Sequence, residues 1–174
     1  YGMDLEGIAQ AADGSYWMVE EYGPSVAKFS SGGKLLEILK PGKGLPAVLG
    51  QRKLNRGFEG AAIIGSRLYV ALQSPLENSH SEKGDSRIVR IIEVDLLGRR
   101  TLGQFAYVLE SSKSDKIGDL AVIGPRSLVV VERDGKKGSK SFKRAYRVSL
   151  EGATNLQLLP ERIVGKGGTL ESMG

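Results

Sequence analysis

The sequence contains no cysteine, a single histidine and no run of about 18 apolar residues. Without cysteine, the 174-residue chain can form neither disulfides nor Cys-ligated metal sites, and it offers no thiol nucleophile. One histidine cannot build a metal site that needs several histidines. Because no apolar run is long enough, no segment is expected to cross a membrane as a helix.

Charge of one sign is not strongly dominant either. The chain has 25 Lys and Arg against 20 Asp and Glu, a net charge of +5. One segment between two expected strands concentrates basic residues, namely Lys136, Lys137, Lys140, Lys143 and Arg144. Such a loop can bind phosphates or be a solvated hairpin tip. Only Phe142 interleaves with the cations, so a nucleic-acid partner is not expected.

Glycine is abundant, with 24 residues, and a motif recurs in the chain. An acidic residue lies among small and apolar residues in Asp4-Leu5-Glu6-Gly7-Ile8-Ala9, Gly57-Phe58-Glu59-Gly60-Ala61-Ala62 and Ile117-Gly118-Asp119-Leu120-Ala121-Val122. Each copy is followed by a Gly-containing turn and an apolar run rich in β-branched and aromatic residues. We divide the chain into repeat units at about 4–54, 55–115 and 116–168 within one region, 1–174.

Each unit predicts four short antiparallel strands. The second strands are Tyr16–Glu21, Leu68–Gln73 and Leu128–Arg133; the third are Val26–Phe29, Ile88–Val94 and Ala145–Val148; the fourth are Leu35–Leu39, Gly103–Val108 and Leu156–Leu159. The apolar pattern of 88–94 predicts a strand with both faces partly covered. Repeated four-stranded units are typical of a β-propeller. We therefore expect an all-β fold with three blades of a larger ring of about six or seven, in a piece of a longer chain.

The recurring acids are the first candidate site. With Glu6, Glu59 and Asp119 aligned, the repeat places all three on first strands, which lie nearest the axis of a propeller. Converging carboxylates suit Ca²⁺ or Mg²⁺. The alternative is structural, because an acid beside glycine can cap the backbone of a neighbouring blade.

The exits of the second strands form a second candidate site. Glu21, Gln73 and Arg133 share one repeat position but differ in chemistry, which is typical of a substrate pocket; the alternative is that these exits are ordinary turns with solvated tips. Arg56 precedes the second acidic motif, and its guanidinium suits phosphate binding or, alternatively, an ion pair with Glu59.

The motifs together resemble the phytase-like family, described as "esterase-like activity of phytase". They are Asp4–Ala9, Glu21-Tyr22-Gly23-Pro24, Asn55–Gly60, Leu72-Gln73-Ser74-Pro75 and Glu132-Arg133-Asp134-Gly135. The resemblance implies a propeller-like fold, a hydrolase of phosphoric monoesters or carboxylic esters, and a periplasmic or secreted bacterial protein. It also implies that the channel or pocket is lined by Glu6, Glu21, Arg56, Glu59, Gln73, Asp119, Glu132 and Arg133.

Two functions follow as hypotheses. In the first, the protein is a hydrolase with Glu6, Glu59 and Arg56 as catalytic residues. Glu21, Gln73 and Arg133 then bind a small ester or phosphoester, and Glu6, Glu59 and Asp119 hold Ca²⁺. In the second, a non-catalytic propeller binds a ligand or protein on one face, and the acids are structural. The oligomeric state is left open.

Overall fold

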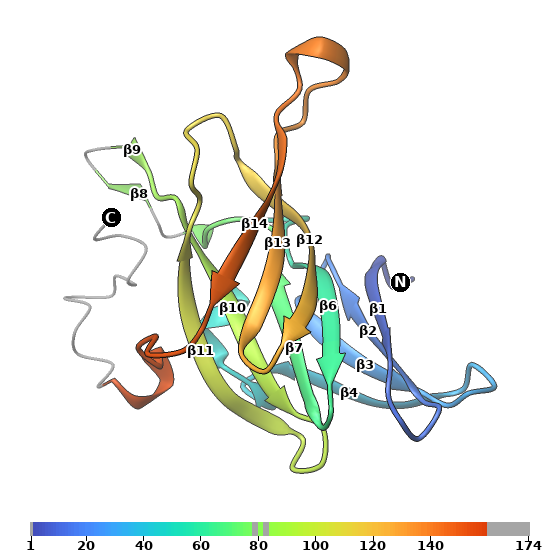
Figure 1. Ribbon diagram of the computed structural model, residues 1–174. Coiled ribbons are helices and arrows are strands. Elements are labelled where there is room, and N and C mark those ends of the chain that lie inside the picture. Colours follow the sequence, from blue (N-terminus) through green and yellow to red (C-terminus); the bar gives the residue numbers. More distant parts are fainter. Residues whose placement is uncertain (1, 78–79, 82–83, 160–174) are drawn as a thin grey trace.

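The computed structural model describes residues 2–77, 80–81 and 84–159, and its main body is three antiparallel sheets (Figure 1). In the first sheet, four strands follow one another in chain order, and a short fifth strand runs parallel to the fourth. These strands are β1 (Leu5–Gln10), β2 (Tyr16–Glu20), β3 (Ser25–Phe29), β4 (Leu35–Pro41) and β5 (Gly44–Leu45).

The second sheet has four strands and the third has three. The second contains β6 (Phe58–Ile64), β7 (Arg67–Leu72), β10 (Ile88–Asp95) and β11 (Arg100–Val108). The third contains β12 (Lys116–Gly124), β13 (Ser127–Arg133) and β14 (Lys143–Ser149). A separate two-stranded ribbon pairs β8 (His80–Ser81) with β9 (Gly84–Asp85).

Helical structure in the described residues is confined to short 3-10 turns. They are η1 (Ala47–Gln51), η3 (Gly138–Lys140) and η4 (Leu156–Leu158). None of the helices within the described ranges is long and apolar enough to cross a membrane. The expectation of an all-β chain is confirmed.

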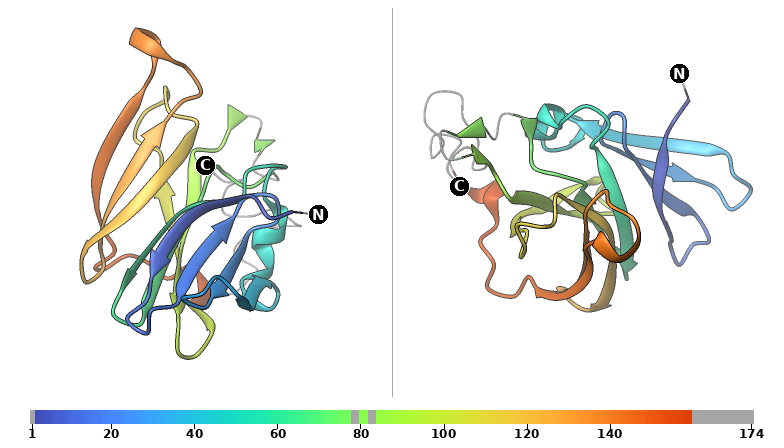
Figure 2. Two further views of the ribbon diagram at one scale, coloured as in Figure 1. Left: turned by 90° about the vertical axis from the view of Figure 1, so that its right-hand side faces the viewer. Right: turned by 90° about the horizontal axis from the view of Figure 1, so that it is seen from above.

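The second sheet lies between the other two, as the turned view in Figure 2 shows. Its central strands are accordingly buried on both faces: Leu68–Leu72 of β7 and Val89–Val94 of β10 are buried throughout. The expectation that the 88–94 strand is covered on both sides is therefore confirmed. β13 instead alternates, with Leu128 and Val130 fully buried and the intervening residues partly exposed.

The first strands of the three sheets are adjacent, with β6 between β1 and β12. Glycine makes this approach possible. A Cβ at Gly7 would lie 2.9 Å from the backbone N of Ala61, and one at Gly60 would lie 2.6 Å from the backbone N of Leu120. Both distances are shorter than real Cβ contacts, and backbone cannot move aside as a flexible side chain can.

Backbone hydrogen bonds also join the sheets at one end. The carbonyl of Glu21, just after β2, accepts from Gly57 N before β6 at 2.8 Å. Gly57 O in turn accepts from Gln73 N at 2.7 Å, and Gln73 O accepts from Ile117 N of β12 at 2.8 Å. A Cβ at Gly57 would overlap the Glu21 carbonyl. The residues that follow β2 and β7, the second strands of the first two sheets, are thus hydrogen-bonded to the beginning of the next sheet.

One expected strand is wrong. Residues 156–158 form η4 instead of a fourth strand of the third sheet. The Asn155 side chain explains the difference: it caps η4 by accepting from Gln157 N, and it also bonds Leu102 O and Gln104 N of β11 at 2.9 and 3.0 Å. The segment therefore docks on the second sheet. Residues 160–168 of the third repeat unit lie outside the described residues, and the division into units stays a prediction.

A substitution at Gly60 tests the close approach of β6 and β12. We expect Gly60→Ala to lower the free energy of unfolding by about 1–3 kcal/mol, because the new methyl overlaps backbone atoms of β12. Urea denaturation measures the change. Gly124→Ala is the matched control in β12, since its Cβ meets an ordinary contact of 3.8 Å. Equal losses in the two variants would contradict the assignment.

Candidate functional site

The sequence-predicted residues Glu6, Glu21, Glu59, Gln73 and Arg133 lie at one end of the three sheets, where first strands begin and second strands end. Glu6 lies at a β-bulge: Leu5 pairs with Glu20 while Gly7 already pairs with Val19. Glu59 lies at the same kind of bulge in the second sheet. A bulge re-aims the side chain of the extra residue, and here that residue is a carboxylate in two sheets.

The third sheet corrects the alignment of the acids. Its bulge lies between Ile117 and Asp119, so Gly118, and not Asp119, is the counterpart of Glu6 and Glu59. Asp119 pairs with Val131, as Gly60 pairs with Ala71. The alignment of the acids from sequence is one residue off because the order of acid and glycine differs between motifs. The first two motifs have Glu-Gly at the bulge, and the third has Gly118-Asp119.

Asp119 takes a different place from the one expected. Its side chain is exposed, and its Oδ1 accepts from Leu120 N at 2.8 Å. Asp119 and Glu6 nevertheless line the same hollow of about 430 Å³, which runs along β1, β6 and β12. The arrangement brings Asp119 to the hollow, although no hydrogen bond joins it to Glu6 or Glu59 among the described residues.

Gln73 is the centre of a polar network. Its amide nitrogen donates to Glu21 Oε1 at 2.8 Å and to Glu59 Oε2. Its amide oxygen accepts from Arg56 Nη1 at 2.7 Å. Arg133 Nη2 donates to the remaining oxygen of Glu59. Both Glu59 oxygens are therefore occupied, and the two arginines are oriented with further N–H groups available.

Gly118 explains how Arg133 reaches Glu59. A Cβ at Gly118 would lie 2.7 Å from the Arg133 side chain, so the guanidinium stem crosses the space that glycine leaves open. The ion pair joins β13 to β6 across the boundary between the third and second sheets. Arg133 stays partly exposed, with 33% of its side-chain surface accessible, while the Glu59 side chain is buried.

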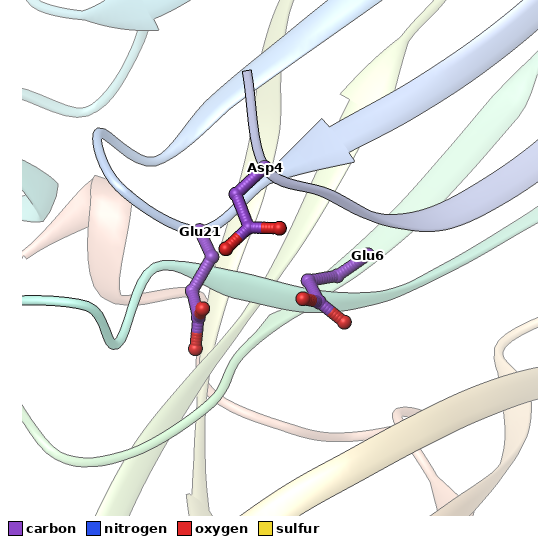
Figure 3. Close-up of side chains that lie close together, drawn as sticks. All are labelled: Asp4, Glu6 and Glu21. Carbon is purple, nitrogen blue, oxygen red and sulfur yellow. The ribbon is translucent and has the colours of Figure 1, made fainter. Parts of the chain in front are cut away.

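The carboxylates of three side chains, Asp4, Glu6 and Glu21, lie close together (Figure 3). We call this set of three side chains the carboxylate group. One oxygen from each lies within 4.8 Å of the others. Glu21 is buried, Asp4 is half-buried and Glu6 is exposed, so the group opens to solvent on one side. Sequence reasoning missed Asp4. The available signal was its place in the first acidic motif, two residues before Glu6.

The electrostatics of the carboxylate group reflect its crowding. The pKa of Glu6 is raised, first by burial and then by the charges of Glu59 and Asp4, while Arg133 acts in the opposite direction. Burial likewise raises the pKa of Glu21, against the hydrogen bond from Gln73. Like charges disfavour ionisation and favour a proton or a cation between them.

Two other acids near this end are structural. Glu20 accepts from the backbone N–H groups of Tyr22 and Gly23 at 3.0 and 2.7 Å, and so shapes the turn after β2. Glu132, expected to face the pocket, is fully buried in the interior. Its Oε1 accepts from Tyr107 OH at 2.6 Å and from Glu110 N at 2.7 Å. Its Oε2 has no hydrogen-bond partner in the part of the chain that the structure describes.

The fold is all-β, and its site is a carboxylate group beside two oriented arginines. The chain belongs to the phytase-like family described as "Esterase-like activity of phytase", whose sequence model matches residues 1–164. It is also similar to an uncharacterized secreted protein of Arthroderma benhamiae, with 32% identity over 136 residues. That match covers 62% of this chain but 27% of the relative, so the chain spans about a quarter of the relative's length.

Two solved structures show limited similarity. The tail fiber of Staphylococcus aureus phage P68 matches with a TM-score of 0.47 and 14% identity, over 79% of this chain and 27% of that one. The hydrazine synthase of Kuenenia stuttgartiensis matches with a TM-score of 0.29 and 11% identity, over 88% of this chain and 66% of that one.

Removing the Gln73 amide tests the polar network. We expect Gln73→Leu to lower the free energy of unfolding by about 2–4 kcal/mol, because it leaves buried groups of Glu21 and Glu59 without their partner. Chemical denaturation measures the loss. Gln10→Leu, at the exposed end of β1, is the control and should change stability by less than about 0.5 kcal/mol. A Gln73→Leu variant as stable as the control would show that the network is unimportant.

The raised pKa values of Glu6 and Glu21 predict a pH dependence. In the interval above the ordinary glutamate pKa, the folded protein binds more protons than the unfolded chain, so the free energy of unfolding falls as pH rises. Glu6→Gln/Glu21→Gln removes both titrations and should flatten this fall between about pH 4 and pH 7. Denaturation at several pH values measures it. Exposed Glu151→Gln is the control, and a wild-type profile parallel to that of the double variant would refute the assignment.

Proposed function

We propose that the protein is a hydrolase of phosphoric or carboxylic esters, assisted by a divalent cation, with Ca²⁺ as the expected ion. The observation that carries the proposal is the convergence of Asp4, Glu6 and Glu21 oxygens within 4.8 Å, beside the network that orients Arg56 and Arg133. Membership in the phytase-like family supports a hydrolytic activity. Because the chain spans a quarter of its relative, the activity of the whole protein is part of the proposal.

The donor set fits a hard cation. Ca²⁺ takes about 6–8 oxygen ligands, and the three carboxylates supply at least one oxygen each, which leaves positions for water or substrate. The raised pKa values of Glu6 and Glu21 point the same way, since a cation relieves the repulsion that raises them. Asp4 and Glu21 replace Glu59 and Asp119 of the original expectation, because each Glu59 oxygen already accepts a hydrogen bond and the oxygens that converge belong to Asp4, Glu6 and Glu21.

The residues of this chain then have distinct roles. Asp4, Glu6 and Glu21 hold the cation, which supplies polarisation of the ester oxygen and a bound water of lowered pKa. Arg133 and Arg56 present their free N–H groups to the phosphate of a small substrate. Glu59 and Gln73 are positioning residues that fix the two guanidinium groups. Asp119 stands along the hollow that leads from Glu6 and contacts the remainder of the substrate.

The finer fold assignment belongs to the same proposal. The three sheets are successive blades of a β-propeller, with β1, β6 and β12 nearest the axis and further blades supplied by the rest of a longer chain. Adjacent first strands and antiparallel strand order in each sheet support this arrangement. A secreted relative supports a location outside the cytoplasm, either periplasmic or extracellular.

A second candidate function is a non-catalytic propeller that binds a ligand or protein on one face. The specific observation in its favour is that the polar groups of Glu59 and Gln73 form hydrogen bonds within the protein. In that case the network only stabilises the boundary between sheets. Cation binding with no hydrolysis would separate this function from the first.

A thermal melt across a CaCl₂ titration, with EDTA as reference, tests the cation site. We expect the midpoint to rise with Ca²⁺, because a ligand held only by the folded state stabilises it by about 2.7 kcal/mol at 100 times its Kd. Glu6→Gln and Glu21→Gln should each abolish most of this shift. Glu151→Gln, which removes an exposed carboxylate elsewhere, should retain it. A midpoint indifferent to Ca²⁺ would overturn the cation site.

Hydrolysis of p-nitrophenyl phosphate and p-nitrophenyl acetate is measured on the same proteins. The hydrolase predicts turnover that EDTA and Glu6→Gln abolish while folding is retained. Undiminished turnover in Glu6→Gln and Glu21→Gln would refute the roles of these residues. A Ca²⁺-dependent melt without turnover of either ester would favour the non-catalytic function.

A further inference from the structure

The hairpin between β13 and β14 carries a second charged surface, separate from the carboxylate group. It projects beyond the sheets in Figure 1. A hollow of about 650 Å³ at this hairpin is lined by five cations, and we call them the basic hairpin surface: Lys113, Lys136, Lys140, Lys143 and Arg144. The lining contains a single carboxylate, that of Asp134.

The hairpin is held in shape from its base. Asp134 is buried, and its Oδ1 accepts from Lys143 Nζ at 2.9 Å and from Lys136 N at 3.2 Å. Lys143 Nζ also donates to the carbonyl of Asp134 at 2.8 Å. At the tip, Ser141 bonds the carbonyl of Gly138 through its backbone and its hydroxyl. The one acid of the surface is therefore used to close the hairpin.

The remaining ammonium groups are not neutralised. Within the described ranges, the side chains of Lys113, Lys136 and Lys140 are exposed and have no ion pair or hydrogen bond. Several like charges kept around one hollow repel one another, and an anion bound between them relieves that repulsion.

We propose that the basic hairpin surface binds a ligand that carries two or more phosphate groups. Lysine ammonium groups are strongly hydrated point charges with flexible stems, which suit phosphate oxygens at several positions. Several cations around one hollow favour several linked phosphates over a single phosphate, because each further contact is made within the same ligand. This binding site does not depend on the proposed hydrolase activity.

The surroundings disfavour nucleic acid and membrane insertion. Phe142 is the aromatic residue in the lining, and the Arg144 guanidinium lies over its ring at 5.8 Å from the centroid. The single ring in the lining is thus already paired with a cation on one face, whereas single-stranded nucleic acid is usually bound by several aromatic rings on which successive bases stack. The lining offers no exposed aliphatic side chains that would enter a lipid layer. Phosphate groups match the charge that the surface displays.

Isothermal titration with sodium tripolyphosphate and with orthophosphate tests the proposal on the full 174-residue chain. We expect tripolyphosphate to bind at least about tenfold more tightly, with an affinity that falls as NaCl screens the lysines. Lys136→Gln/Lys140→Gln should weaken binding about tenfold or more, while Lys34→Gln/Lys43→Gln, with the same net charge, should leave it unchanged. These lysines are exposed, so circular dichroism and the thermal midpoint should match wild type.

The outcomes separate the alternatives. Absence of tripolyphosphate binding, equal affinity for orthophosphate, or equal losses in both double variants would overturn the proposal. Single-stranded oligothymidylate that binds more tightly than tripolyphosphate would also overturn it, in favour of nucleic acid. Phosphatidylcholine vesicles with phosphatidylinositol 4,5-bisphosphate identify the source of the phosphates. Sedimentation with them that requires Lys136 and Lys140 indicates a lipid headgroup, and tripolyphosphate binding without sedimentation indicates a soluble ligand.

Discussion

Backbone hydrogen bonds between the end of one sheet and the start of the next fix the geometry on which the site depends. The carbonyl of Glu21 holds Gly57, and the carbonyl of Gln73 holds Ile117. The two carbonyls belong to Glu21 and Gln73, whose polar side chains are part of the site. Since backbone bonds are short and directional, the side chains of Glu21 and Gln73 are brought to the boundary between sheets with little freedom. Function and sheet assembly therefore share the same residues.

The two ends of the molecule use buried acids differently. At the end opposite the site, Glu93 accepts from Arg67 Nη1 at 3.1 Å and Tyr69 OH at 3.2 Å, and Arg126 lies 3.6 Å away. One carboxylate there meets two cations, so its charge is balanced. At the site end, Asp4, Glu6 and Glu21 gather, while Arg133 is already paired with Glu59. Among the described residues no cation is ion-paired with these three carboxylates, which is the physical reason to propose a ligand for them.

Strand positions were predictable from sequence because the strands are apolar runs between turns. The second-strand exits Glu21, Gln73 and Arg133 were predictable as one position because the repeat keeps them in register. Three features were not. A β-bulge adds a residue without a sequence signature, which misplaced Asp119. Asn155 bonds across 53 residues to Leu102, so the 3-10 turn η4 at 156–158 reflects tertiary contacts. The second hydrogen bond to the Glu59 carboxylate comes from Arg133, which lies 74 residues away in the sequence.

The glycines of the first strands connect the site with the hollow beside it. Gly7 and Gly60 allow β1, β6 and β12 to approach closely, and the glutamates just before them, Glu6 and Glu59, lie at the β-bulges. In β12 the corresponding residue is Asp119, which has a side chain and lies at an exposed position. A neighbouring first strand could not approach β12 there as closely as β12 approaches Gly60. At this repeat position, β1 and β6 have a glycine that allows two sheets to approach, whereas β12 has Asp119, whose carboxylate lines the same hollow as Glu6.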